Sequence, residues 1–522
     1  MQSKRGWLWV AVLASALFFP FLGQVHLFDW DELNFAEIAR EMIVSGDYLN
    51  IQIAFQPFYE KPPLFFWLQA LSMHLWGINE FAARFPNAVV GVVAMLLLFK
   101  WGSTYRDQRF GWLWVMAYAG SMFPFIYFKS GIIDPLFNLL IFSAVWLYFR
   151  GNGPRNGLLL GGLIGLAILT KGPVALLIFG LVVVVDLLTS RGMRWQGIGS
   201  WLLFGISLLA VGGSWFLIQI ARGDVNVVVE FIQVQVNLFS KGVAGHDQPW
   251  FYHPVVLLIG CFPASIFALG LIWRRSEPSD ASRNMQILFW VVLILFSIVT
   301  TKIVHYSSLA YYPISFFAAR ILHEGQMARW MKIGILFIGI IWVTIFAVFP
   351  WMLTSGLNFL KAKIADPQIL AMLDQSFHFS PLAYALGPFF GLMLLSWTWQ
   401  HWRKNSVSGW MLFGTSTLTV FLFMLTVVPQ VERITQGAAV EMYQSFRGKE
   451  VVLNTGYFKS YGYLFYSDAD SIGHSSPSLE RPHFTVSQIR SEAQMEADSV
   501  FMLIRESGGY QLYYRQLYYW HP

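Results

Sequence analysis

Apolar runs long enough to cross a lipid bilayer recur along this chain. A first run extends from Gly6 to about Leu27, and the others centre on residues 82–100, 110–128, 132–149, 156–170, 173–189, 197–220, 254–273, 287–301, 307–322, 332–353, 381–399 and 409–428. A membrane-spanning helix needs ~20 predominantly apolar residues. Only 12% of the residues are charged, against about 25% in soluble domains. We therefore expect an all-α polytopic membrane protein with about 13 transmembrane helices.

The first apolar run could be an uncleaved span or a cleaved signal peptide. It is long for a signal peptide, and the small residues 14–16 fall inside the apolar region, which favours an uncleaved span. Lys4 and Arg5 precede it and would keep the N-terminus in the cytoplasm. Phe28 and the residues after it would then lie outside.

Basic residues support this topology. Every loop expected in the cytoplasm contains a basic pair or more: Lys100, Arg106 and Arg109; Arg150 and Arg155; Arg191 and Arg194; Arg274, Arg275 and Arg283; Arg329 and Lys332; Arg403 and Lys404. This is the asymmetry that the positive-inside rule requires. The net charge of +6 therefore reflects membrane topology and gives no reason to expect nucleic acid as a partner.

A charged stretch, residues 28–67, directly follows the first apolar run. It contains Asp29, Asp31, Glu32, Glu37, Arg40, Glu41, Asp47, Glu60 and Lys61. Ionisable groups beside lipid are costly unless they are solvated, paired or used. We interpret this stretch, within a first outer loop at 28–80, as half of an active site at the membrane surface.

The spacing within this stretch predicts an interfacial helix over 31–45. Apolar residues recur on one face, and Glu37, Arg40 and Glu41 occupy the other. Asp31 and Glu32 stand at its N-terminus, where they could serve as chemical groups. An equally simple alternative is that they only cap the helix and favour its dipole.

Further polar residues interrupt the apolar pattern on the same side. Glu60 and Lys61 precede two prolines that hold the backbone, so Lys61 suits a phosphate, although it could merely extend to the headgroups. Asp134, before Pro135, could simply start a helix. Lys171 could lie in a tight turn, and His246 is a candidate metal ligand, although a lone loop histidine is usually not one.

Residues 430–522 differ in composition from the rest and predict a small α/β domain outside the membrane, following a transmembrane domain at 1–429. Residues 450–454 are typical of a short strand, and 457–466 of an aromatic amphipathic segment. Residues 499–504 and 510–514, separated by Gly508 and Gly509, predict a hairpin.

The location of the polar residues bears on function. Outer loops that fold over one cavity could bring a carboxylate base together with lysines or a divalent metal that stabilises a departing phosphate. No nucleotide-phosphate loop is present, so a donor already carried in the membrane fits better. A transporter or flippase of lipid-linked sugars would instead place charges at mid-depth. A non-catalytic scaffold would tolerate substitution of Asp31, Lys61 and Asp134.

Several motifs together resemble a known family. Their order, at residues 31–42, 58–64, 133–137, 169–173, 246–252 and 301–306, is similar to the bacterial GT-C glycosyltransferases. The pattern looks most like the ArnT group, which transfers aminoarabinose to lipid A, within the protein O-mannosyltransferase-like superfamily. The resemblance implies the GT-C fold and covers roughly the first 320 residues.

The resemblance also implies roles. By position, Asp31 matches the catalytic base and Asp134 the second essential carboxylate, and Lys61 matches the donor-phosphate lysine. Glu60 and His246 match metal ligands, zinc in the relative, with magnesium or manganese as alternatives. The remaining candidates are Lys302 and Tyr306 for the phosphate, with Glu32, Lys171 and His305 nearby. Ile303 and Val304 replace a Leu-Pro pair of the family pattern.

The expected function is an inverting, inner-membrane glycosyltransferase of the cell envelope. It would take a sugar from a polyprenyl, here undecaprenyl, phosphate and work on the periplasmic side, with membrane lipids as surroundings. The acceptor group would be a hydroxyl or a phosphate, on lipid A of the lipopolysaccharide or on another lipid or glycan, or a protein hydroxyl as in O-mannosyltransferases.

Overall fold

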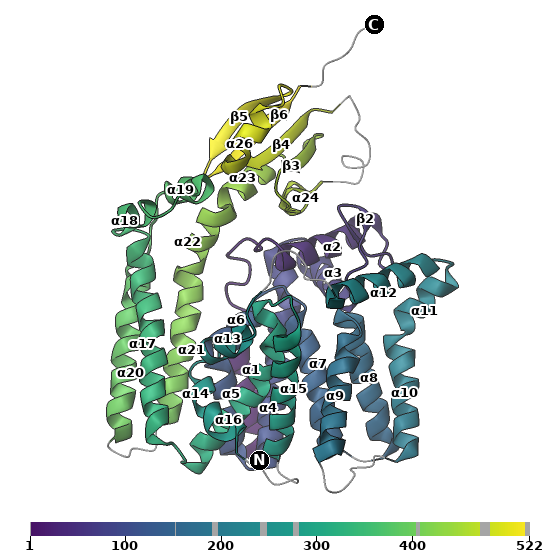
Figure 1. Cartoon of the computed structure of the whole chain (residues 1–522), viewed down its shortest axis with the longest axis vertical. Coiled ribbons are helices and arrows are strands. Elements are labelled where there is room, and N and C mark those ends of the chain that lie inside the picture. The colour runs from purple at the N-terminus through teal and green to yellow at the C-terminus, as the bar shows by residue number, and fades with distance from the viewer. Residues whose placement is uncertain are drawn as a thin grey trace.

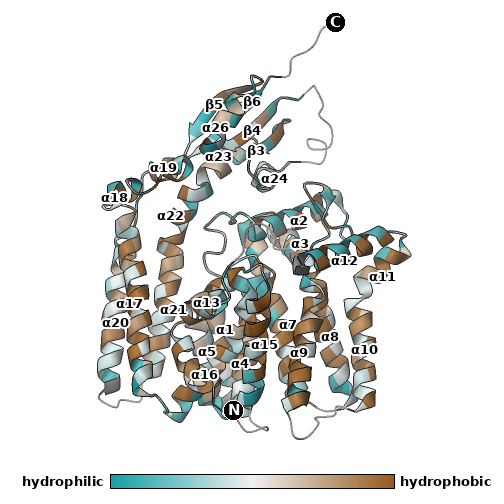
Figure 2. Ribbon diagram, in the orientation of Figure 1, coloured by the Kyte–Doolittle hydropathy of each residue, from teal (hydrophilic) through white to brown (hydrophobic). Residues whose placement is uncertain are grey.

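The computed structural model describes residues 2–151, 153–189, 197–240, 248–274, 281–402, 408–469 and 481–516. Long helices run roughly side by side, short helices lie across one end of them, and a small sheet stands beyond that end (Figure 1). Hydrophobic residues dominate the long helices, whereas the short helices and the sheet are more mixed (Figure 2). The His246 prediction falls outside the described residues.

The helices of the bundle match the apolar runs of the sequence. They are α1 (Gln2–Phe18), α4 (Glu80–Tyr105), α5 (Gln108–Ala119), α6 (Met122–Tyr127), α7 (Asp134–Arg150), α8 (Pro154–Lys171), α9 (Val174–Thr189), α10 (Ile198–Gly212), α11 (Ser214–Ala221), α13 (Tyr252–Gly260), α14 (Ala264–Ile272), α15 (Ala281–Ile298), α16 (Tyr311–Glu324), α17 (Arg329–Met352), α20 (Pro381–Trp402) and α21 (Ser408–Thr426).

Fewer of these helices are long enough to span a membrane than the sequence predicts. Among the described residues, five helices qualify by length and composition, and α10 with α11 makes a sixth that is bent by 55°. The expected count of about 13 is therefore not confirmed. Several predicted spans are broken where helix-breaking residues occur, as at Gly120 between α5 and α6, Gly213 between α10 and α11, and Pro263 between α13 and α14. The first run also ends early as a helix, at Phe18, two residues before Pro20.

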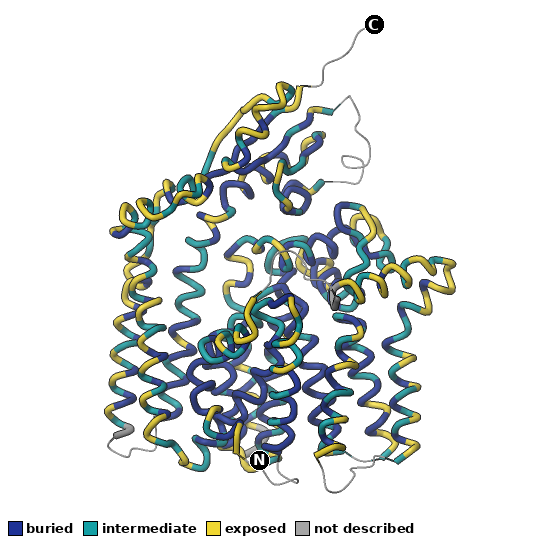
Figure 3. Tube along the Cα trace, viewed as in Figure 1, coloured by how far each residue is buried: buried dark blue, intermediate teal, exposed yellow. Residues whose placement is uncertain are grey.

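The core of the bundle lies in its middle. The side chains of α4, α5, α7 and α16 are largely buried, whereas α10, α17 and α20 are exposed along their outer sides (Figure 3). These exposed sides are apolar: α10 presents Ile198, Leu202, Ile206 and Leu209 at helical spacing. Such a stripe is what a helix shows to lipid rather than to water.

Short elements connect and cover the ends of the bundle. They are α2 (Asp31–Ser45), β1 (Gln52–Ile53), β2 (Gln56–Pro57), α3 (Leu64–Trp76), α12 (Val225–Ser240), the 3₁₀ helix η1 (Val304–Ala310), α18 (Leu357–Lys361), α19 (Pro367–Leu373), α22 (Val428–Glu432), the π-helical turn η2 (Arg433–Gly437) and α23 (Ala438–Gln444). The helix predicted over 31–45 is therefore confirmed as α2, and α2, α3 and α12 lie across the bundle (Figure 1).

The C-terminal region forms a four-stranded sheet. Its elements are β3 (Val452–Gly456), α24 (Gly462–Ser467), β4 (His483–Gln488), η3 (Ile489–Ser491), α26 (Glu492–Glu496), β5 (Phe501–Ser507) and β6 (Tyr510–Arg515). The strand order is β3-β4-β6-β5, with β3 parallel to β4 and the other pairs antiparallel. The predicted hairpin is β5 and β6, and the predicted first strand is β3, shifted by two residues. Strand β4 was not predicted.

Glycines allow α8 and α10 to pack closely. A Cβ atom on Gly161 would lie 2.3 Å from the Phe204 carbonyl oxygen, and one on Gly165 would lie 2.8 Å from the Gly212 nitrogen. The small-residue spacing of Gly161 and Gly165 therefore serves contact between backbones, as in other membrane helix pairs.

This contact gives a stability prediction. Gly161→Ala should lower the unfolding free energy by ~1–3 kcal/mol, because the new methyl group overpacks a backbone contact. Gly162→Ala is the matched control, since its nearest neighbour would be Ser207 Oγ at 3.4 Å. Thermal unfolding of the purified protein in detergent would compare them, and equal melting temperatures for the two variants would contradict the packing described.

Candidate active site

Four of the predicted polar residues meet where α2, α7, α8 and η1 converge. The Lys171 ammonium donates a hydrogen bond to Asp134 Oδ1 at 2.6 Å. His305 Nε2 lies 3.7 Å from Asp134 Oδ2 and 3.6 Å from Asp31 Oδ2. The Asp31 side chain is 45% exposed, whereas that of Asp134 is 4% exposed. One carboxylate is therefore open to an incoming molecule and the other is held inside.

The local turns explain how α7 and α8 supply their residues. Asp134 is the first residue of α7, and Pro135 lies in its first turn. This is the helix start that the sequence analysis gave as the simple interpretation of Asp134. Helix α8 ends at Lys171 because Gly172 has a φ of 97°. The helix-start interpretation of Asp134 is therefore confirmed, whereas Lys171 is the last residue of α8 and does not lie in a tight turn, and both residues also reach the site.

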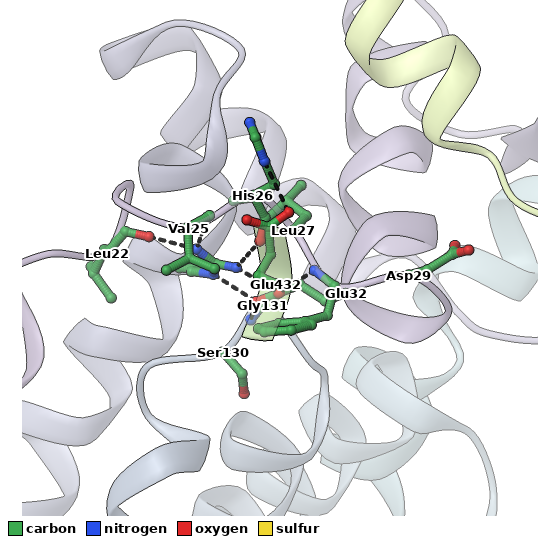
Figure 4. A network of polar contacts seen from close by, with 12 residues as sticks. Leu22, Val25, His26, Leu27, Asp29, Glu32, Ser130, Gly131 and Glu432 are labelled. Atoms are coloured by element: carbon green, nitrogen blue, oxygen red, sulfur yellow. Dashed lines mark hydrogen bonds and ion pairs between the residues drawn. The ribbon is translucent and has the colours of Figure 1, made fainter. Parts of the chain in front are cut away.

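A buried ion pair holds these elements together. Arg84 of α4 donates to both carboxylate oxygens of Glu32 at 2.8 Å, and to the Leu22, Val25 and His26 carbonyls (Figure 4). Glu32 also accepts hydrogen bonds from the backbone N–H groups of Phe28 at 2.9 Å and Gly131 at 2.6 Å.

This pair assigns Glu32 a positioning role. Burial alone would raise the pKa of Glu32, but the Arg84 charge and the hydrogen bonds that it accepts lower it below the ordinary value. Glu32 is therefore ionised, and both of its carboxylate oxygens accept hydrogen bonds. It sits beside Asp31 in the chain and binds Gly131, three residues before Asp134.

The turn before α7 has further support. Asn87 of α4 donates to the carbonyls of Ser130 at 2.7 Å and Ile132 at 2.6 Å. Gln69 of α3 donates to the Gly131 carbonyl of this turn at 3.5 Å and to the Ala83 carbonyl of α4 at 2.9 Å. Sequence reasoning missed Arg84, Asn87 and Gln69, because nothing in an apolar helix marks which polar residue contacts the site.

Lys61, one of the predicted donor-phosphate residues, lies beside Glu60. Lys61 forms an ion pair with Glu60, and the Glu60 carbonyl accepts a hydrogen bond from Gln235 of α12 at 2.9 Å. Burial would raise the pKa of Glu60, but Lys61, Lys171 and Lys459 together lower it. The charges of all three lysines therefore act on the Glu60 carboxylate.

Tyr306 and Lys302 differ in placement although they are near in sequence. The Lys171 ammonium lies 5.0 Å from the centre of the Tyr306 ring. Burial raises the pKa of Tyr306 to about 12, so its hydroxyl stays protonated and can donate. The Lys302 ammonium instead donates to the Val299 carbonyl at 2.8 Å.

A cavity of about 230 Å³ opens beside these groups. Its lining comes from three parts of the chain: Asp29, Trp30, Asp31, Asn34, Phe35, Ile53, Phe58 and Glu60; Thr301, Ile303 and Tyr306; Lys459, Ser460 and Tyr461. The C-terminal region thus contributes a wall of the cavity that sequence reasoning did not anticipate. The signal available was the segment Lys459–Tyr461 in a polar, aromatic stretch.

The residues described do not by themselves make a metal centre. Within them, no three His, Cys, Asp or Glu side chains are grouped to hold an ion. Glu60 is engaged by Lys61, and His246 lies outside the described residues.

Helix α2 carries a second set of buried charges. Arg40 donates to both oxygens of Glu37 at 2.7 Å and to the Ala469 carbonyl at 2.9 Å. Glu41 accepts a hydrogen bond from the Phe55 N–H at 2.9 Å. The sequence placed these three residues on the polar face of an interfacial helix. In the structure Glu37, Arg40 and Glu41 are buried, and α24 of the C-terminal region packs on α2.

The amino-acid sequence is similar to those of known proteins. A family model described as dolichyl-phosphate-mannose-protein mannosyltransferase matches residues 60–215. An undecaprenyl phosphate-alpha-4-amino-4-deoxy-L-arabinose arabinosyl transferase of Edwardsiella ictaluri is 25% identical over 455 residues, which are 82% of this chain and 78% of that protein. The enzyme of the same name from an Enterobacter species is 28% identical over 314 residues, so the match spans 57% of this chain and 55% of that protein.

Solved structures agree. ArnT from Cupriavidus metallidurans in the apo state superposes with a TM-score of 0.76 at 17% identity, covering 98% of both chains. The same protein bound to undecaprenyl phosphate gives 0.75, covering 97% of both chains. The chain therefore has the GT-C fold. An archaeal oligosaccharyltransferase, AglB from Archaeoglobus fulgidus, is a more distant match at a TM-score of 0.52.

The buried charges on α2 of this GT-C protein predict a pH dependence. Burial and the charge of Glu37 raise the pKa of Glu41 from 4.5 to about 8. Between these values the folded protein holds a proton that the unfolded chain has lost, so the stabilisation due to Glu41 is present below 4.5 and is lost as pH rises to about 8.

Glu41→Gln tests this directly, because its amide imitates the protonated carboxyl. The variant should lose less thermal stability than the wild-type protein when the pH rises from about 5 to about 8. Melting temperatures across this range would check it. Parallel curves for the two proteins would show that Glu41 is ionised in the folded state throughout.

Proposed function

We propose that this GT-C glycosyltransferase moves a sugar from a polyprenyl phosphate, in particular undecaprenyl phosphate, to an acceptor. The transfer would take place on the outer side of the membrane in which the protein lies. The observation that carries the proposal is the meeting of Asp31, Asp134, Lys171 and His305 beside one cavity. The names of the relatives supply the donor: they are arabinosyl transferases, and ArnT has been solved with undecaprenyl phosphate.

Lysines would stabilise the leaving phosphate. Lys171 contacts Asp134 and lies 5.0 Å from the centre of the Tyr306 ring, whose hydroxyl adds a neutral donor. Lys61 contacts Glu60, which lines the cavity. A departing phosphate gains negative charge, and preorganised cations in a site shielded from water stabilise that charge without reorganisation. In the free protein Lys171 is paired with Asp134 and Lys61 with Glu60, which keeps these cations in place before the donor binds.

Asp31 would act as the general base. Its half-exposed carboxylate lines the cavity, whereas Asp134 is enclosed and paired. The acceptor oxygen attacks the anomeric carbon as its proton passes to Asp31. The bond from that carbon to the phosphate oxygen breaks, and its electron pair leaves with the polyprenyl phosphate. A single displacement of this kind inverts the configuration at the anomeric carbon.

The donor and the acceptor differ in kind. The donor is a membrane lipid, and the polar ends of α7, α8 and η1 lie at one end of the apolar bundle, where its phosphate would reside. We propose lipid A, or another glycan or lipid of the cell envelope, as the acceptor. We also propose that this end of the bundle, with residues 430–522, faces the periplasm across the inner membrane.

Substitution of Asp31 tests the base. Asp31→Asn should lower the rate of sugar transfer by ~10²–10⁴-fold, because the amide cannot take the proton. The assay is transfer of labelled sugar from undecaprenyl phosphate to lipid A, with the product identified by mass spectrometry.

A matched control is Asp224→Asn, which removes a carboxylate of similar exposure that does not line this cavity and should affect transfer much less. Both variants should keep the melting temperature of the wild-type protein. Near-normal turnover by Asp31→Asn would remove Asp31 from the mechanism.

A further inference from the structure

Trp30 has an unusual conformation for its position. Its φ of 75° and ψ of −126° place a bulky residue in a region that L-amino acids rarely adopt. Its side chain is 61% exposed, so packing does not require a tryptophan there. It nevertheless lines the cavity, directly beside Asp31.

The surroundings impose this conformation from both sides. The Trp30 N–H donates to Asp29 Oδ1 at 2.9 Å, and its carbonyl accepts from the Asn34 N–H at 2.8 Å. The Asp29 N–H in turn donates to Gln436 Oε1 of η2 at 3.2 Å, and its carboxylate is hydrogen-bonded to Ser460. Strain that is held so firmly next to reactive groups is typical of functional sites.

A second aromatic ring joins the same cavity from the C-terminal region. Tyr461 lines it together with Ser460 and Lys459, and the Lys459 ammonium lies 5.5 Å from the centre of the Tyr461 ring. Tyr306 lines the cavity from another segment of the chain, and the Lys171 ammonium lies 5.0 Å from the centre of its ring. Asp31 belongs to the same lining, near His305.

We propose that Trp30 and Tyr461 form the acceptor subsite, where they stack against the face of a sugar ring in a saccharide acceptor. The assignment rests on the proposed function, since the donor phosphate occupies the lysine side and an inverting attack comes from the opposite side. Flat aromatic rings offer large apolar contact at low entropic cost, and one face of a sugar ring presents C–H groups to them. A protein hydroxyl acceptor needs no such surface.

A simpler role for Trp30 would be that of a membrane-interface anchor, since tryptophan is common at that depth. An anchor needs no left-handed backbone and no place in the cavity. The two roles make different predictions, because an anchor affects stability or lipid contact and a subsite affects acceptor affinity.

Trp30→Gly separates them. Glycine adopts a φ of 75° without strain, so the variant should keep or raise the melting temperature. Loss of the ring should raise the KM for the acceptor about tenfold, the upper end of the worth of one aromatic contact, and leave the KM for the donor unchanged. Tyr461→Ala should act in the same direction, and Trp30→Phe should retain most of the affinity.

The control is Trp351→Ala, which removes another tryptophan, 52% exposed, at the end of α17 and should change neither KM. The measurements are initial rates with each substrate varied in turn, and calorimetric titration of a saccharide acceptor in the absence of donor. An unchanged acceptor affinity in Trp30→Gly would overturn the subsite while wild-type transfer still supports the function. Absence of wild-type transfer would overturn the function, and the titration would then decide on the subsite alone.

Discussion

The ion pair between Glu32 and Arg84 is the interaction on which the site depends. Each of the five N–H donors of Arg84 has a partner: two on Glu32 and three on the carbonyls of Leu22, Val25 and His26. Both oxygens of Glu32 also accept a backbone N–H. A buried charge is stable only when it is paired and hydrogen-bonded. Removal of either partner would leave the other as an unpaired buried charge. The pair therefore binds α2, α4, the segment 22–28 and the turn before α7 into one unit.

This unit determines where the two acidic groups of the site lie. Asp31 precedes Glu32, and Asp134 follows Gly131 by three residues, so one carboxylate of the ion pair positions both. Two like charges near one another are unfavourable unless cations intervene. Lys171 on Asp134 provides this. His305 comes from another helix and lies near both aspartates, and burial lowers its pKa, which favours the neutral ring there. The arrangement leaves Asp31 as the acidic group with access to the cavity.

The sequence predicted those parts of the structure that follow from local pattern. The apolar runs, helix α2 and the β5–β6 hairpin depend on periodicity and turn residues, which a single sequence displays. The burial of the polar face of α2 was not predicted, because the same pattern suits a face that contacts water or another part of the protein, and here α24 packs on α2. Arg84 and Asn87 were missed because a polar residue inside a span carries no sign of its partner. Lys302 shares a motif with Tyr306, but its ammonium donates a hydrogen bond to the Val299 carbonyl of the preceding turn. A sequence motif does not reveal such a contact.

The C-terminal region completes the cavity rather than merely standing beside it. His26 pairs with Glu432 at 2.9 Å, Gln436 receives the Asp29 N–H and donates to the Leu27 carbonyl, and Tyr466 receives the Leu27 N–H. Arg40 extends the same contact toward Asp468 and Ala469. The short segment before α2 is thus held between the bundle, through Arg84, and the C-terminal region. Because Asp31 follows this segment directly, the geometry of the base depends on both halves of the chain, although the two halves differ entirely in composition and fold.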